Sequence, residues 1–509
     1  MSPFSPSHRA RPRKSDDTYL RELGYEPVLT RRMGPFGNFA ISFSVISVLS
    51  GCMTLYGFGL NTGGPSVMLW GWLVVGAMVM FIGAALAEVT SAYPTSGALY
   101  YQAEQLGGRK WGWYTGWLNL LGLLGAIAGI DYGAALFTGA FLNLQWGFEP
   151  TPGKIMVIFL CILAVHLALN LFGVRLVSIL NSLSVWWHLG GVTVIVGALA
   201  IVPSHHQSAD FVFGEFVNNT GWSSPLYVAV LGLLLAQYTF CGYDASAHLS
   251  EETRDAQVSA SRGIIHAIGW SWLAGFVLLA GLTFAIQDYA GTVSTATGVP
   301  PAQIFLDALG VAGAKALLLV VIVAQLCCGN AETAAASRMV FAFSRDGALP
   351  GSHLWRQVDH RTGTPRKAVL LSVVCAAVLA LPSLYSPVAY AAITSINVVG
   401  ITPAYAIPIF LRIKNRHRFR PGPWNLGSWG VIVGTIAVMW VVFVTVLFCL
   451  PQTRPDGALV SVDTFNYAPI ALFAVLALAW AWWQKQGSSY EVPAQNFDRS
   501  ASTYEDEVV

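Results

Sequence analysis

The chain's strongest structural constraint is a series of about a dozen apolar segments, each long enough to cross a membrane. A helix rises about 1.5 Å per residue, so about 20 apolar residues span the hydrocarbon core of a bilayer. The predicted spans lie near residues 36–60, 67–92, 113–143, 155–173, 177–202, 224–249, 263–287, 313–344, 368–382, 388–411, 428–450 and 464–484. A membrane barrel would instead show short strands of alternating character. The pattern therefore predicts an all-α integral membrane protein with 12 transmembrane helices.

Composition agrees with this class and excludes others. Hydrophobic residues make up 55% of the 509 residues and charged residues 11%, against roughly 25% charged residues in a typical soluble domain. A net charge of +2 offers no surface for nucleic acid. The seven cysteines fall within predicted spans, so we expect neither a disulfide framework nor a metal site, and no motif indicates a cofactor.

Basic residues predict the orientation, because Lys and Arg in short loops stay on the cytoplasmic side. With the N-terminus inside, 25 of the 28 basic residues are cytoplasmic, and Lys154, Lys315 and Arg454 are the three outside. We therefore expect a multi-pass protein with both termini cytoplasmic; the expected location is the plasma membrane. The domain prediction is a polar tail over 1–35, a membrane domain over 36–486 and a second tail over 487–509, with no cleaved secretory signal.

The sixth predicted span contains glycine and ionisable residues where hydrocarbon-facing residues are expected. It reads Phe240-Cys241-Gly242-Tyr243-Asp244, and His248 follows. An ionisable group inside a bilayer is costly and usually faces a protein interior or an aqueous path. Glycine lets a helix unwind and expose its backbone to a ligand. The alternative is a helix that reaches the cytoplasm early, so that its charges are only interfacial.

The first span carries a matching interruption at Ser50-Gly51-Cys52. Broken helices at corresponding positions of two halves point to the binding site of a transporter. The backbone N–H groups of Gly51, Cys52 and Met53 are candidates for binding a carboxylate, because a half-helix N-terminus carries free donors and a positive dipole end. For Gly51 alone, close packing between helices is the alternative.

Carbonyl groups near the second break are candidates for binding an ammonium group, with Asp244 as a possible helper. Aromatic side chains near both breaks could close over the ligand or form a cation–π wall, although ordinary helix packing also explains them. The predicted substrate-binding residues are Ser50, Gly51, Cys52, Met53, Tyr56, Tyr238, Phe240, Cys241, Gly242, Tyr243 and Asp244.

Four motifs resemble a known family. They are Ser50-Gly51 followed by Gly63-Gly64-Pro65, the run from Ala87-Glu88 through Tyr93-Pro94-Thr95-Ser96-Gly97 to Tyr101, the run from Gly242 to His248, and the run from Ser337-Arg338 to Gly347-Ala348-Leu349-Pro350. The chain resembles the amino acid–polyamine–organocation transporter superfamily, most closely its amino acid/choline branch, over nearly all of residues 30–485. The resemblance implies a five-plus-five inverted repeat with discontinuous helices 1 and 6, two extra C-terminal helices, and substrate bound between the two broken spans. Many relatives have Gly-Ser-Gly in span 1, whereas this chain has Leu49-Ser50-Gly51.

The resemblance also suggests a proton-coupling group. Proton-coupled relatives often carry a lysine in span 5, and alignment through Gly173-Val174-Arg175 and Asn181 puts His188 in its place. Histidine titrates at about pH 6.5 when unperturbed, so it could gain and lose a proton during a cycle. A neutral histidine with a backbone partner is the alternative.

Further ionisable residues lie within the spans. Glu332 precedes Arg345 by about 20 Å of helix and is therefore deep; it could bind a proton, contact a cationic substrate, or pair with Arg338 or Asn330. A structural role is favoured for Asp131. In span 6, Asp244, His248 and Glu252 share one helix face, which indicates either a pathway or a solvated helix end.

The sequence thus favours a secondary active transporter for small amino acids or amino-acid-like amines such as 4-aminobutyrate (GABA), driven by protons or by exchange. Choline or a polyamine is the alternative substrate, and a non-transporting nutrient sensor is the alternative function. We find no phosphate-binding glycine loop, metal-spaced cluster or nucleophile motif that would indicate an enzyme. The expected partners are the substrate, the lipid bilayer and a proton, and the oligomeric state stays open.

Overall fold

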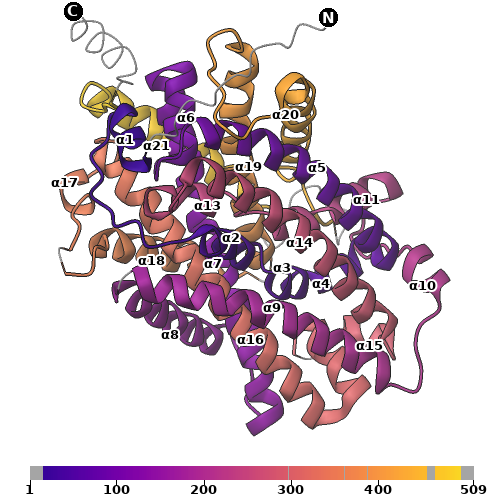
Figure 1. Cartoon of the computed structure of the whole chain (residues 1–509). Coiled ribbons are helices and arrows are strands. Elements are labelled where there is room, and N and C mark those ends of the chain that lie inside the picture. The colour runs from indigo at the N-terminus through magenta and orange to yellow at the C-terminus, as the bar shows by residue number, and fades with distance from the viewer. Residues whose placement is uncertain are drawn as a thin grey trace, which may run out of the picture.

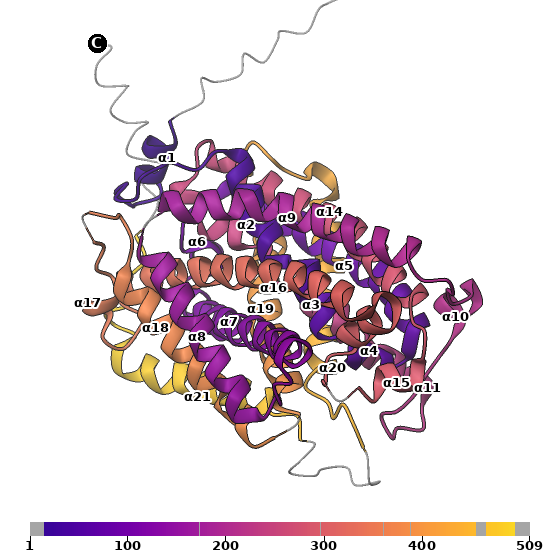
Figure 2. The same cartoon turned by 90° about the horizontal axis from the view of Figure 1, so that it is seen from below.

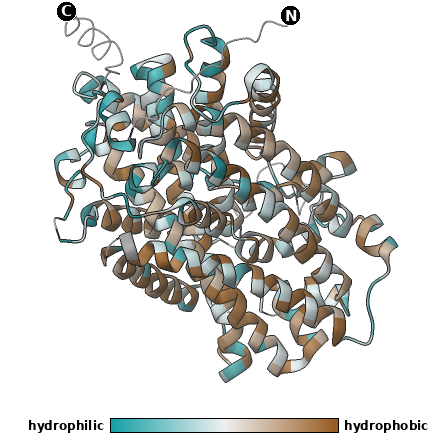
Figure 3. Cartoon of the chain, viewed as in Figure 1, coloured by the Kyte–Doolittle hydropathy of each residue, from teal (hydrophilic) through white to brown (hydrophobic). Residues whose placement is uncertain are grey.

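The computed structural model describes residues 15–172, 174–295, 297–359, 361–386, 388–454 and 465–493. Within these residues, 11 helices are long and apolar enough to cross a membrane, and Pro225–Thr239 is a shorter apolar helix. Together they confirm the predicted all-α membrane fold (Figure 1). Apolar residues dominate the long helices, and the polar stretches gather toward one end of the bundle (Figure 3).

The helices follow the predicted segments closely. Span 1 consists of α2 (Pro35–Ile46), α3 (Val48–Thr54) and α4 (Tyr56–Asn61), and span 6 of α11 (Pro225–Gly232), α12 (Leu234–Thr239) and α13 (Ala245–His248). The other spans are α5 (Gly64–Ala92), α7 (Arg109–Trp146), α8 (Pro152–Leu171), α9 (Val174–Ile201), α14 (Ala256–Phe284), α16 (Pro300–Arg345), α18 (Arg366–Ala380), α19 (Ala389–Lys414), α20 (Gly430–Leu447) and α21 (Ala468–Gln486). Shorter helices are α1 (Asp16–Glu22), α6 (Ala98–Gly107), α10 (Ala209–Gly214), α15 (Tyr289–Val293) and α17 (Ser352–Trp355). Gly310, at φ 69°, kinks α16 just before the predicted start of span 8.

Both predicted interruptions exist, but one lies elsewhere than expected. In span 6 the chain leaves the helix between Thr239 and Ala245, and Gly242 has φ 85°, which a glycine adopts without strain. In span 1 the break is at Ser47, at φ 32°, and Ser50, Gly51 and Cys52 are helical. The prediction of a break at residues 50–52 is therefore wrong by three residues.

The described ends of the chain meet on one side of the bundle, which we call the terminal face. Leu20 and Leu23 at α1 are buried, and the Tyr25 hydroxyl donates to Asp346 just after α16 (2.8 Å). Beyond α21, the Glu491 backbone N–H donates to the Asp346 carbonyl (3.1 Å). Part of each predicted polar tail therefore packs on this face. The side with α10 and α15 is the distal face.

The helix α16 crosses the middle of the bundle, packed against α7 on one side and α9 on the other (Figure 2). It also contacts both halves of span 1 and the α13 half of span 6. This position brings deep residues of α16 to the two breaks, where the candidate site lies.

Candidate substrate site

A small internal cavity lies between the two breaks. Its volume is about 20 Å³, room for about one water molecule, so an amino acid would enter only if the helices moved apart. Its lining residues are Val45, Ile46, Ser50, Gly51, Ala126, Ile130, Tyr238, Thr239, Cys241, Gly242, Cys328, Glu332 and Asn397. The lining thus combines both broken spans with α7, α16 and α19.

Four lining residues carry buried polar atoms without a hydrogen-bond partner among the described residues. These atoms are the hydroxyls of Ser50 and Tyr238, the Asn397 Oδ1 atom and both carboxylate oxygens of Glu332. A buried polar atom without a partner is costly, and functional sites are a common reason for one. Together they offer two hydroxyls and several acceptors to a small zwitterion.

Six predicted site residues line this cavity: Ser50, Gly51, Tyr238, Cys241, Gly242 and Glu332. Three predicted aromatic residues have other partners. The Tyr56 hydroxyl is 2.8 Å from Thr283 Oγ1, the ring centroid of Phe240 is 4.4 Å from that of Trp72, and that of Tyr243 is 4.6 Å from that of Tyr405. Among the described lining residues, Tyr238 is the single aromatic one.

The predicted backbone cradle at Gly51, Cys52 and Met53 is not available. The Gly51 N–H donates to the Ser47 carbonyl (3.0 Å), and Cys52 and Met53 follow the first turn of α3, where N–H groups bond within the helix. A Cβ atom added to Gly51 would lie 2.3 Å from Thr239 Oγ1, so glycine permits the close approach of α3 and α12. The close-packing alternative for Gly51 therefore applies.

The carbonyls predicted to bind an ammonium group are also partly engaged. The Tyr238 carbonyl accepts the Cys241 N–H at 3.1 Å. The sequence did not identify the other polar lining residues, Thr239 and Asn397. Asn397 is in α19, far from both breaks in sequence, and no local pattern marks it.

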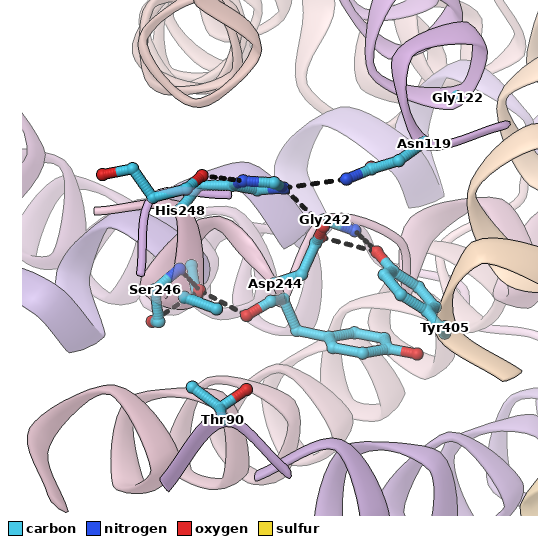
Figure 4. Close-up of polar contacts among 12 residues, drawn as sticks. Thr90, Asn119, Gly122, Gly242, Asp244, Ser246, His248 and Tyr405 are labelled. Atoms are coloured by element: carbon cyan, nitrogen blue, oxygen red, sulfur yellow. Dashed lines mark hydrogen bonds and ion pairs between the residues drawn. The ribbon is translucent and has the colours of Figure 1, made fainter. Parts of the chain in front are cut away.

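Asp244 belongs to a buried network beside the cavity rather than to its lining (Figure 4). Its Oδ1 atom accepts the Tyr405 hydroxyl (2.7 Å) and its Oδ2 atom lies 3.1 Å from His248 Nε2. His248 also contacts Asn119 Nδ2 (3.2 Å) and donates from Nδ1 to the Ser96 carbonyl (3.1 Å). The Tyr405 hydroxyl in turn accepts the Gly242 N–H (3.1 Å).

Both Asp244 oxygens are therefore occupied, and the prediction that Asp244 contacts the substrate amine does not fit the structure. The network instead ties the broken part of span 6 to α7 and α19. His248 and Asp244 are four residues apart, as the sequence indicated, but their partners Asn119 and Tyr405 are more than 100 positions away.

His188 contacts the break of span 1 directly. Its Nδ1 atom lies 2.7 Å from the Ser184 carbonyl, which can only accept, so Nδ1 carries the hydrogen. Its Nε2 atom lies 2.6 Å from the hydroxyl of Ser47, the residue in the left-handed conformation. In the neutral ring, Nε2 accepts this hydroxyl; protonation would turn it into a donor. His188 does not line the cavity, but it contacts Ser47 in span 1, which contributes part of the lining.

The pairings considered for Glu332 are not formed. Arg338 instead pairs with Glu252 (3.0 Å), and the Asn330 side-chain oxygen accepts from Asn170 (3.0 Å). Asp131, for which a structural role was favoured, is fully buried, with its Oδ2 atom 2.9 Å from His166 Nδ1.

Ion pairs lie between the cavity and the terminal face and hold this face closed. They join Glu252 to Arg338, Glu251 to Arg345 and Glu88 to Arg412 at 3.0, 3.2 and 2.8 Å. Glu252 is fully buried, so the alternative of a solvated helix end is wrong for this residue.

A vestibule of about 330 Å³ opens on the distal face and reaches inward to Met53, Thr54 and Tyr390. A hollow of about 560 Å³ lies on the terminal face between α6, the start of α7 and the end of α19, and none of its lining residues lines the cavity. The vestibule comes closer to the cavity, because Met53 and Thr54 follow the cavity residues Ser50 and Gly51 in α3.

Two broken spans around one closed cavity define a membrane transporter of the broken-helix class. The model of the amino acid permease family matches residues 33–476. The chain is 40% identical to the amino-acid permease BAT1 of Arabidopsis thaliana over 92% of this chain and 94% of that protein. It is 41% identical to the BAT1 homolog of Oryza sativa (91% and 92% covered) and 30% identical to the GABA-specific permease of Saccharomyces cerevisiae (95% and 86% covered). The chain belongs to the amino acid permease family, within the superfamily that its sequence resembles.

Proposed function

We propose that this permease is a secondary active transporter of small amino acids or amino-acid-like amines such as GABA, coupled to protons or working by exchange. The observation that carries the proposal is the set of unpartnered buried groups at one cavity, which belong to Ser50, Tyr238, Asn397 and Glu332. A hydroxyl can donate to a carboxylate, and amide and carboxylate oxygens accept from an ammonium group. The names of the similar permeases, one of them GABA-specific, support the same substrate class.

His188 is the proposed coupling group. A proton on Nε2 would reverse the direction of its hydrogen bond with Ser47 and so act on the span 1 break. A hydrogen bond that is stronger in one of two conformations shifts the equilibrium toward that conformation. Glu332 is the second proposed proton site, because it is buried beside the same cavity.

Choline is the less favoured substrate. A quaternary ammonium is recognised by an aromatic cage, and among the described cavity residues Tyr238 alone is aromatic. A polyamine carries no carboxylate for the Ser50 hydroxyl. A nutrient sensor that binds without moving its ligand stays as the alternative function and is separated by uptake measurements.

We further propose that the terminal face is cytoplasmic and that the protein acts in the plasma membrane. The excess of basic residues in the segments on this side supports the orientation. The conformation described above would then be closed to the cytoplasm, and the vestibule would be the entry from outside.

Uptake by proteoliposomes tests the function. The purified full-length protein is reconstituted, and uptake of labelled GABA, alanine, choline and putrescine is measured with and without an inward proton gradient. We expect saturable uptake of an amino acid or GABA and little of choline. A folded protein that binds one of these amino compounds but moves none of them would contradict transport and favour a sensor.

A further inference from the structure

Glu332 is the one acid around the cavity for which the described structure provides no partner. Its side chain is fully buried, it lines the cavity, and both its oxygens lack a hydrogen-bond donor among the described residues. A Cβ atom at Gly242 would lie 3.7 Å from Glu332 Oε2, so the carboxylate is next to the span 6 break.

Among the described residues, no lysine or arginine acts on Glu332 to balance its charge. The titratable groups that interact electrostatically with Glu332 are Asp131 on α7, Asp244 and Cys241 at the break, Tyr238 on α12 and Cys328 on α16. Asp131 already pairs with His166, and Asp244 with His248. On α9, His188 uses both ring nitrogens for Ser47 and Ser184. The nearest arginine along α16, Arg338, pairs with Glu252.

An ionised carboxylate in such a place is unfavourable, and a buried acid takes up a proton instead. The neutral form is therefore the stable one while the cavity holds no cation. A substrate ammonium group changes this balance, because it supplies the missing opposite charge and up to three donors for the unpartnered oxygens of Glu332 and Asn397.

We propose that the substrate ammonium group and a proton compete for Glu332, so that substrate binding releases one proton. The O–H bond of the Glu332 carboxylic acid breaks, its proton passes to water, and the carboxylate forms an ion pair with the ammonium group, without any redox change. The inference rests on the proposed function and specifies its substrate class: compounds with a protonated amine. It also fixes the direction of proton movement at this residue as exchange.

Isothermal titration calorimetry of the purified full-length protein tests the proposal. GABA and alanine are titrated at pH 7 in phosphate and in Tris, whose ionisation enthalpies differ, and the difference in heat gives the number of protons released. We expect about one proton released per amino compound bound. In the pH range where Glu332 of the free protein is protonated, we also expect the Kd for the amino compound to rise about tenfold for each unit by which the pH is lowered. Butyrate, which lacks the amine, should release none.

The variant Glu332→Gln should release no proton and show a Kd that does not change with pH. Glu104→Gln is the matched control, because it makes the same change at another largely buried acid, on α6 and outside the cavity; it should behave as the wild type. Zero release or proton uptake by the wild type would overturn the proposal, and so would release that persists in Glu332→Gln. If Glu332→Gln does not fold, the wild-type proton count decides alone. Uptake of GABA or alanine without proton release would reject the exchange at Glu332 and leave the proposed function standing, whereas a protein that transports nothing would reject the function itself.

Discussion

The ion pair between Glu252 and Arg338 should hold the terminal face closed, and Glu252→Gln tests this. Both side chains are 1% exposed, and Arg338 Nε lies 3.0 Å from Glu252 Oε1. The substitution keeps the size of the side chain but leaves the guanidinium without its opposite charge. Removing one partner of a buried ion pair costs about 3–5 kcal/mol.

Most of this cost applies to the closed conformation, because opening lets water reach Arg338. Weak contacts to the Ala334 carbonyl (3.4 Å) and the Ser337 hydroxyl (3.3 Å) remain in the variant, which favours the lower end of the range. A loss of about 3 kcal/mol corresponds to roughly a hundredfold increase in the open population.

Hydrogen exchange measures this opening directly. Two backbone N–H groups report on the closed face: Met33 donates to the Glu252 carbonyl (3.0 Å), and Arg254 to the Met33 carbonyl (2.9 Å). In Glu252→Gln their exchange should be roughly a hundredfold faster, since exchange requires local opening. The matched control is Glu26→Gln, because Glu26 pairs with Arg21 at an exposed position, with side chains 58% and 76% exposed; exposed pairs contribute about 0–1 kcal/mol. Equal exchange in the two variants would refute the role of the buried pair.

Three further predictions concern other parts of the molecule. His188→Gln can still accept the Ser47 hydroxyl but cannot be protonated, so substrate accumulation in proteoliposomes should lose its dependence on pH; retained proton-driven accumulation would reject the coupling role. Gly51→Ala places a methyl group 2.3 Å from Thr239 Oγ1 and should destabilise the protein by about 1–3 kcal/mol, measured as a lower Tm, and Gly51→Ala combined with Thr239→Ala should recover part of the loss. Burial raises the pKa of Glu104, on the terminal face, from 4.5 to about 7; the folded state then binds more protons than the unfolded state between these values, so thermal stability should fall as the pH rises from 4.5 to 7. This fall should be smaller in Glu104→Gln, and an unchanged slope would contradict it.

The amino-acid sequence by itself determined the spans of this permease and the break in span 6. Span prediction works because each helix must satisfy its backbone within one continuous apolar segment, which is local information. The break in span 6 was also readable, because Gly242 occupies a conformation that suits glycine and lies next to an acid that a simple span would not carry. The depth of Glu332 followed from helix geometry alone.

Only the tertiary structure decided where span 1 breaks and what each buried polar group contacts. Ser47 carries no glycine signal, and its left-handed conformation accompanies a hydrogen bond to His188, 141 residues away. Asp244 looked like a ligand for an amine until Tyr405, from α19, and His248 were seen to occupy its oxygens. For Glu332 the sequence left internal pairing open as an alternative, and only the structure shows that Arg338 pairs with Glu252 and that both Glu332 oxygens have no partner among the described residues. The physical reason is that a sequence pattern reports the cost of burying a charge, whereas the group that offsets the cost comes from a distant part of the chain.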